Sequence, residues 1–178
     1  MSKIMKSISI ISVVLTLVFV MLYNMFGVDA FYTLGITFGT IAYHFCIRLL
    51  IGTIYQGFMK NKADYNRSWY QLSKFEEKLY NKIGVKKWKN KMPTYNSDFF
   101  NPELHTWDEI AQAMCQAELV HETIVIFSFL PIVASIWFGS LGVFIITSVL
   151  SAMYDTLFAI MQRYNRPRII RIIGRTRY

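Results

Sequence analysis

Charged residues are scarce in this chain of 178 residues. Only 17% of the residues are charged, whereas 54% are hydrophobic and 16% are aromatic. Soluble domains carry about 25% charged residues, so the composition argues against a soluble globular protein. It also excludes a disordered chain, because the apolar side chains offer ample surface to bury.

Cysteine and histidine are also rare. Cys46 lies inside an apolar run and Cys115 lies far from it, which gives no recognisable disulfide framework. Three histidines, with no cysteine placed to complete a ligand set, do not indicate a metal site. The chain also lacks an internal repeat and a linker long enough to divide it, so we expect residues 1–178 to form one domain.

Four apolar stretches are long enough, or nearly so, for a helix that crosses a bilayer, which takes about 20 residues. They predict membrane spans over residues 7–26, 31–58, 119–138 and 141–161. Gly139 and Ser140 leave room only for a tight turn, which predicts an antiparallel hairpin of the last two spans. Residues 28–30 resemble a signal-peptide cleavage site, but the first apolar core is longer than is usual for a signal peptide.

The basic residues predict how these spans are oriented. The chain has 19 Lys and Arg against 11 Asp and Glu, and residues 27–30 and 139–140 contain neither Lys nor Arg. Because Lys and Arg gather on the cytoplasmic side of membranes, we place both termini, residues 60–118 and the basic tail at residues 162–178 in the cytoplasm. The expected fold is an all-α integral membrane domain with four transmembrane helices and a cytoplasmic amphipathic helical subdomain.

The cytoplasmic segment has two helix-start signals. Ser68 and Gln71 have capping-box spacing and precede an amphipathic pattern that ends at Gly84. The apolar positions of this predicted helix are Leu72, Phe75, Leu79 and Ile83. A second capping box, Thr106 with Glu109, begins a helix that has no breaker before Pro131, where we expect a kink within the membrane.

A tryptophan lies among lysines at residues 85–92, with Lys86, Lys87, Trp88 and Lys89 at its centre. Indole rings favour the headgroup level and lysines favour anionic lipid, so this stretch is predicted to lie on the inner membrane surface. The alternative is a phosphate-binding strip for an acyl donor.

Ionisable residues also lie within the predicted spans. Asp155 is the only charged residue of the fourth span, and His44 and Arg48 share one helical face of the second. Such residues usually face the bundle interior and are candidates for function. A structural ion pair between Arg48 and Asp155 is an equally good interpretation. His44 alone is better explained as a packed histidine than as a ligand.

Glu118, His121 and Glu122 share one face at the start of the third span. A carboxylate that holds one imidazole nitrogen leaves the other free to take a proton from a hydroxyl. We therefore predict that His121 is a general base and that Glu118 or Glu122 orients it. The alternative is a solvated patch at the membrane interface.

The end of the fourth span carries a polar heptapeptide that includes three arginines. Its residues are Gln162, Arg163, Tyr164, Asn165, Arg166, Pro167 and Arg168. We expect Pro167 to end the helix and the guanidiniums to bind an anionic group through their planar fork of donors. Anchoring by positive charge alone would also produce arginines here, but it would not call for Gln, Tyr, Asn and Pro among them.

Three of these segments together resemble a known family. Residues 85–93 (VKKWKNKMP), 117–121 (AELVH) and 162–168 (QRYNRPR) resemble, in order and spacing, the glycosyl-4,4'-diaponeurosporenoate acyltransferase family. The resemblance covers roughly residues 75–172 and includes no motif of the first two spans. It implies a small integral membrane protein that esterifies a fatty acyl chain to the sugar of a glycosylated carotenoid. The His-x4-Asp pattern of soluble-headed glycerolipid acyltransferases is absent.

The residues and the resemblance together predict a membrane acyltransferase that acts on a hydroxyl of a glycosylated lipid at the inner leaflet. We expect no bound cofactor, an acyl thioester of coenzyme A or of a carrier protein as co-substrate, and membrane lipids rather than nucleic acid as partners. The expected location is the plasma membrane of a bacterial-type cell. A methyltransferase or other headgroup-modifying enzyme, and a non-enzymatic protein that binds a lipid or a partner helix, stay open as alternatives, as does the oligomeric state.

Overall fold

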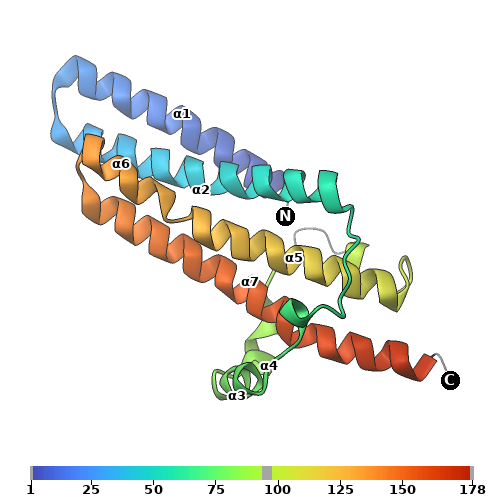
Figure 1. The fold of residues 1–178 in the computed structure, drawn as a ribbon. Helices are drawn as coiled ribbons and strands as arrows, with labels where there is room; N and C mark the ends of the chain where they lie inside the picture. Colours follow the sequence, from blue (N-terminus) through green and yellow to red (C-terminus); the bar gives the residue numbers. More distant parts are fainter. Residues whose placement is uncertain (1, 94–97, 177–178) are drawn as a thin grey trace. The chain divides into compact units, whose positions relative to one another are not determined.

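The computed structural model describes residues 2–93 and 98–176, and within them it contains helices and no strand (Figure 1). Arg177 and Tyr178 of the predicted tail lie outside the described residues. The long helices are α1 (Ser2–Phe26), α2 (Asp29–Met59), α5 (Trp107–Phe127), α6 (Leu130–Phe138) and α7 (Leu141–Thr176). The short helices are η1 (Ser68–Tyr70), α3 (Lys74–Lys82), α4 (Val85–Trp88), η2 (Lys89–Lys91) and η3 (Asp98–Phe100).

Four helical stretches are long and apolar enough to cross a membrane. They cover Lys3–Phe26, Asp29–Met59, Trp107–Phe138 and Leu141–Arg175, and each contains one of the predicted spans completely. The all-helical fold class is therefore confirmed. The orientation of the helices and the location of the termini stay predictions.

The turn between α6 and α7 has the tight geometry expected from its sequence. Gly139 and Ser140 have φ angles of 65° and 51°, and the backbone N–H of Val143 donates to the Ser140 carbonyl at 2.9 Å. The left-handed conformation favours glycine, which explains Gly139 at this position. Only these two residues join the helices.

Two predicted helix boundaries, at Ser68 and Pro167, are wrong, and the interruption predicted at Pro131 is present. Ser68 does not cap a helix, because it lies in η1 and α3 begins several residues later, after Ser73. The interruption predicted at Pro131 is present at Ser128 and Phe129, in the turn that precedes this proline, so that Pro131 itself stands in the first turn of α6. Pro167 does not end α7, which continues through it to Thr176.

The chain divides into two compact units. Unit 2 contains Ser2–Gly52 and Thr123–Tyr154. Figure 1 shows α1 and the first part of α2 side by side in it, and the rings of Phe19 and Phe38 stack at 5.5 Å between these helices. The hydroxyl of Tyr32 donates to the Phe138 carbonyl at 2.9 Å, which joins α2 to α6.

Unit 2 buries several polar side chains and exposes many large apolar ones. Its buried polar residues are Ser9, Ser12, Thr40, His44, Ser128, Ser148 and Ser151. Its exposed apolar residues include Ile10, Leu17, Met21, Ile126, Ile136 and Trp137. This is the reverse of a water-soluble protein and suits helices surrounded by lipid, where small polar residues pack between helices.

Arg48 makes its described contacts inside unit 2. Its guanidinium donates to the carbonyl of His44 and the hydroxyl of Ser151, at 2.8 Å each, and Ser151 lies 3.0 Å from the Ser128 hydroxyl. These contacts give both terminal nitrogens of the guanidinium a hydrogen-bond acceptor among apolar helices. The predicted pairing of Arg48 with Asp155 would join residues of different units and stays a prediction.

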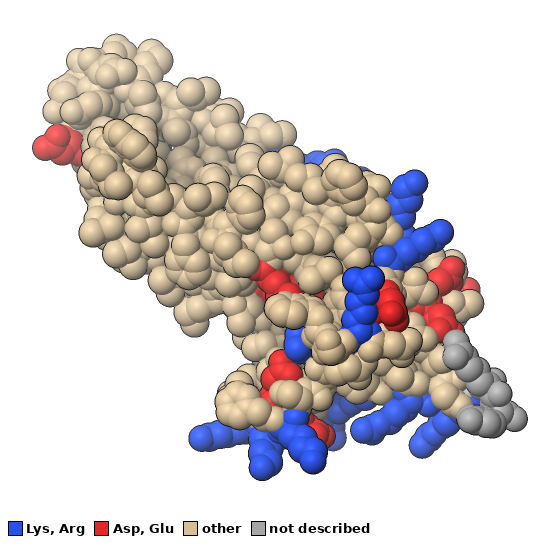
Figure 2. Space-filling view, viewed as in Figure 1, with Lys and Arg blue, Asp and Glu red and all other residues tan. Residues whose placement is uncertain are grey.

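Unit 1 contains Thr53–Glu122 and Asp155–Tyr178. Its core is formed by Tyr80, Val85 and Tyr164, on which Leu72, Trp88 and Ile160 pack. All lysines and arginines of the chain except Lys3, Lys6 and Arg48 belong to this unit, and Figure 2 shows them gathered over it. The polar residues predicted to form the site belong to this unit too, with the exception of His44 and Arg48.

Candidate active site

A capping box on α3 positions the first carboxylate of the site. The Ser73 hydroxyl accepts from the Glu76 backbone N–H at 3.2 Å, and Oε2 of Glu76 accepts from the Ser73 N–H at 2.8 Å. This reciprocal pair satisfies two backbone donors at the helix start and fixes the Glu76 carboxylate. Its other oxygen, Oε1, lies 2.7 Å from Nε of Arg163 on α7.

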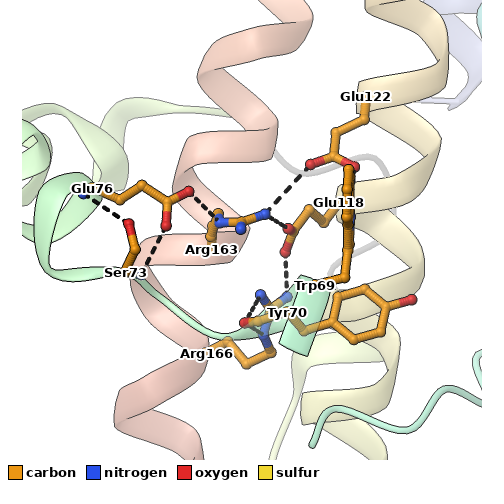
Figure 3. Close-up of polar contacts among 8 residues, drawn as sticks. All are labelled: Trp69, Tyr70, Ser73, Glu76, Glu118, Glu122, Arg163 and Arg166. Atoms are coloured by element: carbon orange, nitrogen blue, oxygen red, sulfur yellow. Dashed lines mark hydrogen bonds and ion pairs between the residues drawn. The ribbon is translucent and has the colours of Figure 1, made fainter. Parts of the chain in front are cut away.

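Glu118 on α5 joins both arginines of α7. Its Oε1 accepts from Nη1 of Arg163 at 2.6 Å, and its Oε2 accepts from Nη1 of Arg166 (Figure 3). Glu118 and Arg166 are both 0% exposed. A buried charge is tolerated only when it is paired and hydrogen-bonded, and this pairing meets that condition.

The remaining donors of Arg166 hold the loop before α3. Its Nε and Nη2 atoms both donate to the carbonyl of Tyr70, the first of them at 3.2 Å. The guanidinium also lies 5.0 Å from the centre of the Tyr70 ring. These contacts connect η1 to α7 and help to explain why α7 continues through Pro167, directly after Arg166.

Glu122 completes the cluster. Its Oε2 accepts from the indole Nε1 of Trp69 at 3.1 Å, and its Oε1 lies 3.6 Å from Arg163. Arg163 therefore faces Glu76, Glu118 and Glu122, as Figure 3 shows. Although burial alone would raise it, the hydrogen bonds from Ser73 and the Arg163 guanidinium hold the pKa of Glu76 below its usual value.

Two of the three arginines predicted to bind an external anion are thus occupied within the protein. Arg163 and Arg166 are neutralised by carboxylates of the same unit and are mostly or fully buried. Arg168 is different, because it is exposed and donates to the Tyr164 hydroxyl at 2.8 Å. The sequence has no means of separating these roles, since the three arginines differ only in the carboxylates that the fold brings to them.

His121 contacts a carboxylate, but not one of the two predicted. Its Nδ1 lies 2.9 Å from Oδ1 of Asp155 on α7, and its ring stacks on Phe158 at 4.8 Å. Glu118 and Glu122 bind arginine and tryptophan side chains instead. The carboxylate that contacts the imidazole in the structure is therefore that of Asp155.

The lysine segment also differs in part from its prediction. Lys86 and Lys87 are exposed, whereas the Trp88 indole packs on the core and donates to the Ile83 carbonyl at 3.3 Å. Lys89 donates to Oδ1 of Asn165 on α7. The indole is therefore held by the protein itself, while contact of the lysines with a membrane stays a prediction.

Sequence reasoning missed several residues of the site. It did not single out Trp69, Tyr70, Ser73 or Glu76, all of which meet the cluster of Figure 3. A signal was available only for Ser73 and Glu76, which have capping-box spacing just as Ser68 and Gln71 do. The role of Tyr70 rests on its backbone carbonyl, which no side-chain pattern reveals.

A model of one protein family matches well over half of this chain. It covers residues 66–175, and its description is glycosyl-4,4'-diaponeurosporenoate acyltransferase. The match includes every residue drawn in Figure 3, His121 and Asp155, and it excludes α1 and α2. No curated protein and no solved structure matches the chain. Within the described residues, no group of three His, Cys, Asp or Glu is placed to hold a metal ion.

Proposed function

The chain belongs to the glycosyl-4,4'-diaponeurosporenoate acyltransferase family, and from this premise we propose that it is a membrane acyltransferase in which His121 is the general base. The reaction joins a fatty acyl group to a sugar hydroxyl of a glycosylated lipid. The acyl group arrives as a thioester. The observation that carries the proposal is the 2.9 Å contact between His121 and Asp155.

This contact supports a defined proton-transfer role for the imidazole. Beside the Asp155 carboxylate, Nδ1 carries the proton and donates it, so Nε2 keeps its lone pair. The His121 side chain is 22% exposed and the Asp155 side chain is 1% exposed. The imidazole is thus open to a substrate, whereas the carboxylate that orients it is shielded from water, as in hydrolytic triads.

The chemical step needs one base and no external oxidant or reductant. Nε2 of His121 takes the proton of the acceptor hydroxyl while that oxygen attacks the thioester carbonyl. The C–O bond forms, the C–S bond breaks, and the thiolate that leaves takes the proton back from the imidazolium. Asp155 stabilises the imidazolium between these two transfers.

We place this chemistry at the cytoplasmic face of the plasma membrane. The exposed apolar side chains of unit 2 support its insertion in lipid, and the lysines and arginines of unit 1 support contact with the cytoplasmic leaflet, which carries anionic headgroups. Both proposed acyl donors, the thioesters of coenzyme A and of a carrier protein, are cytoplasmic molecules. The acceptor then presents its sugar at that face.

The test compares lipids from bacterial membranes that contain the wild-type chain, His121→Ala or His105→Ala. Each membrane is given a glycosylated carotenoid acid and an acyl thioester, and the acylated product is quantified by mass spectrometry. His105 is the matched control, because it pairs with Glu109 at 3.7 Å and lies outside the cluster around His121. We expect product from wild type and His105→Ala, and at least about a hundredfold less from His121→Ala.

Folding is measured in the same samples, by the thermal transition of each protein in detergent. Full product from a folded His121→Ala protein would remove the proposed base. Product that is absent even from wild type, with several glycosylated acceptors, would speak for a non-enzymatic lipid-binding role instead.

A further inference from the structure

Unit 1 contains a cavity of about 590 Å³ that the proposed proton transfer does not use. This volume falls within the range typical of small-molecule sites, about 300–1,000 Å³. The cavity is lined by η2 residues, by the start of α5 and by the part of α7 that follows Phe158. Three kinds of side chain form its wall, and each kind suits a different part of one ligand.

Two cations form the first part of the wall. Lys89 and Arg168 both line the cavity and lie over the ring of Tyr164, at 5.4 Å and 4.7 Å from its centre. In the described part of the chain neither has an ion pair with Asp or Glu, in contrast to Arg163 and Arg166. Burial, followed by the positive charges of Arg168 and Lys86, lowers the pKa of Lys89. Positive charge that the protein does not neutralise favours an anion.

Three carboxamides form the second part. They belong to Asn90, Gln162 and Asn165. Gln162 is only 6% exposed, and its side chain lines the cavity. A carboxamide both donates and accepts hydrogen bonds, so a ligand that carries amide groups is a suitable partner for this part of the wall.

The third part is apolar and rich in methionine. It consists of Met92, Phe100, Trp107, Ile110, Met114, Met161 and Ile169. Methionine is flexible and polarisable, so it adapts to an apolar chain without a fixed shape. The wall thus combines cations, amides and an adaptable apolar surface within one cavity.

We propose that this cavity binds the acyl donor as a thioester of a phosphopantetheine group. Lys89 and Arg168 take the phosphate, the carboxamides pair with the amides of the pantetheine arm, and the methionine-rich wall takes the acyl chain. Coenzyme A and acyl carrier proteins both contain phosphopantetheine, so the cavity would bind the group that the two donors have in common. The inference rests on the proposed function, because it assigns the donor site of that reaction.

The position of Gln162 supports this assignment. Phe158 stacks on the His121 ring, and Gln162 follows Phe158 by one helical turn on α7, a rise of about 6 Å. A ligand that contacts the Gln162 amide therefore lies within about one helical turn of the imidazole along α7. The pantetheine arm ends in the thioester, which is the group that reacts.

The experiment measures binding without turnover, in full-length protein in nanodiscs and without an acceptor. The probes are palmitoyl-coenzyme A, a palmitoyl carrier protein and palmitoyl lysophosphatidic acid, each with a photoreactive group in the chain. The variants are Lys89→Gln and Arg168→Gln. Their matched controls are Lys91→Gln and Arg171→Gln, exposed cations near the cavity that do not line it.

We expect a thioester probe to label peptides that contain Met114 or Met161, and its affinity to fall about tenfold in Lys89→Gln and Arg168→Gln but less than about twofold in the controls. Affinity should also weaken with salt. Whichever thioester binds more tightly identifies the source of the phosphopantetheine. Labelling outside the cavity, equal affinity in all four variants, or binding of lysophosphatidic acid alone would overturn the proposal.

His121→Ala separates this inference from the proposed function. That variant should bind the thioester as wild type does, because His121 does not line the cavity. Binding in the cavity together with undiminished product from His121→Ala would refute the base and keep the donor site. If His121→Ala forms no product and the wild-type cavity binds no thioester, the donor site is refuted and the proposed base is kept.

Discussion

Oδ1 of Asp155 on α7 lies 2.9 Å from Nδ1 of His121 on α5. The two residues are 34 positions apart in the chain, so the contact depends on how the helices pack and not on local spacing. The same two helices are joined by Glu118, which binds Arg163 and Arg166. The proposed base and the buried ion pairs are therefore held by one packing arrangement.

Replacing Asp155 with Asn should reduce turnover and leave donor binding intact. Asn cannot stabilise the imidazolium and permits the wrong tautomer, which in a well-studied triad costs about 10⁴ in kcat. We expect kcat to fall at least about a hundredfold in Asp155→Asn, with the KM for the thioester unchanged within a factor of about three. Asp155→Glu, which keeps the charge, should recover part of the loss. A KM that rises while kcat stays constant would instead mean that Asp155 contributes to donor binding and not to the proton transfer.

Removing the charge of Glu118 should destabilise unit 1 strongly. Glu118→Gln leaves the buried Arg166 guanidinium without its carboxylate, and such uncompensated burial costs about 3–5 kcal/mol. The free energy of unfolding in detergent measures this cost, with the exposed Glu103→Gln as matched control. We also expect Glu118→Leu combined with Arg166→Met to be more stable than Glu118→Gln. A Glu118→Gln protein as stable as the control would refute the role of the pair.

The membrane helices can be predicted from sequence because their signal is local. A run of apolar residues as long as a bilayer is thick specifies a helix wherever it packs, and all four predicted runs are helical. Helix boundaries are less accessible. Ser68 and Ser73 carry the same type of signal, and the contact of Glu76 with Arg163, which lies far away in the chain, distinguishes the second of them only in the folded structure.

The residues of the candidate site can be predicted from the sequence, but the contacts between them cannot. Glu118, His121, Arg163 and Asp155 all stand out in the sequence as polar residues in or beside apolar helices. Which carboxylate meets the imidazole depends on the rotation of α7 against α5. The sequence does not reveal that rotation, because Glu122 and Asp155 are both acidic residues in apolar helices and either could be the one that meets His121.

Substitution of Ser73 should destabilise the first turn of α3, whereas substitution of Ser68 should not. Ser73 accepts from the Glu76 N–H, and loss of such a cap costs about 1 kcal/mol. Ser73→Ala should therefore speed hydrogen exchange at the first amides of α3 about fivefold, whereas Ser68→Ala should leave them unchanged. Hydrogen exchange followed by mass spectrometry provides the measurement. Equal effects of the two substitutions would place the cap elsewhere.

The contribution of Glu76 to stability should depend on pH in a defined direction. Its pKa in the folded state is held below the ordinary value of 4.5. The ionised carboxylate therefore stabilises the fold fully above about pH 4.5, and this contribution is lost as the pH falls through the lowered pKa. Glu76→Gln lacks the charge but keeps an oxygen that can complete the capping box.

The thermal transitions of wild type and Glu76→Gln should differ most above pH 4.5 and converge in more acidic buffer. Other carboxylates titrate in both proteins, so only the difference between the two transitions reports on Glu76. Glu77→Gln is the control, because Glu77 is an exposed carboxylate in the first turn of the same helix. A difference that stays constant or grows as the pH falls would mean that Arg163 stabilises the fold without the charge of Glu76.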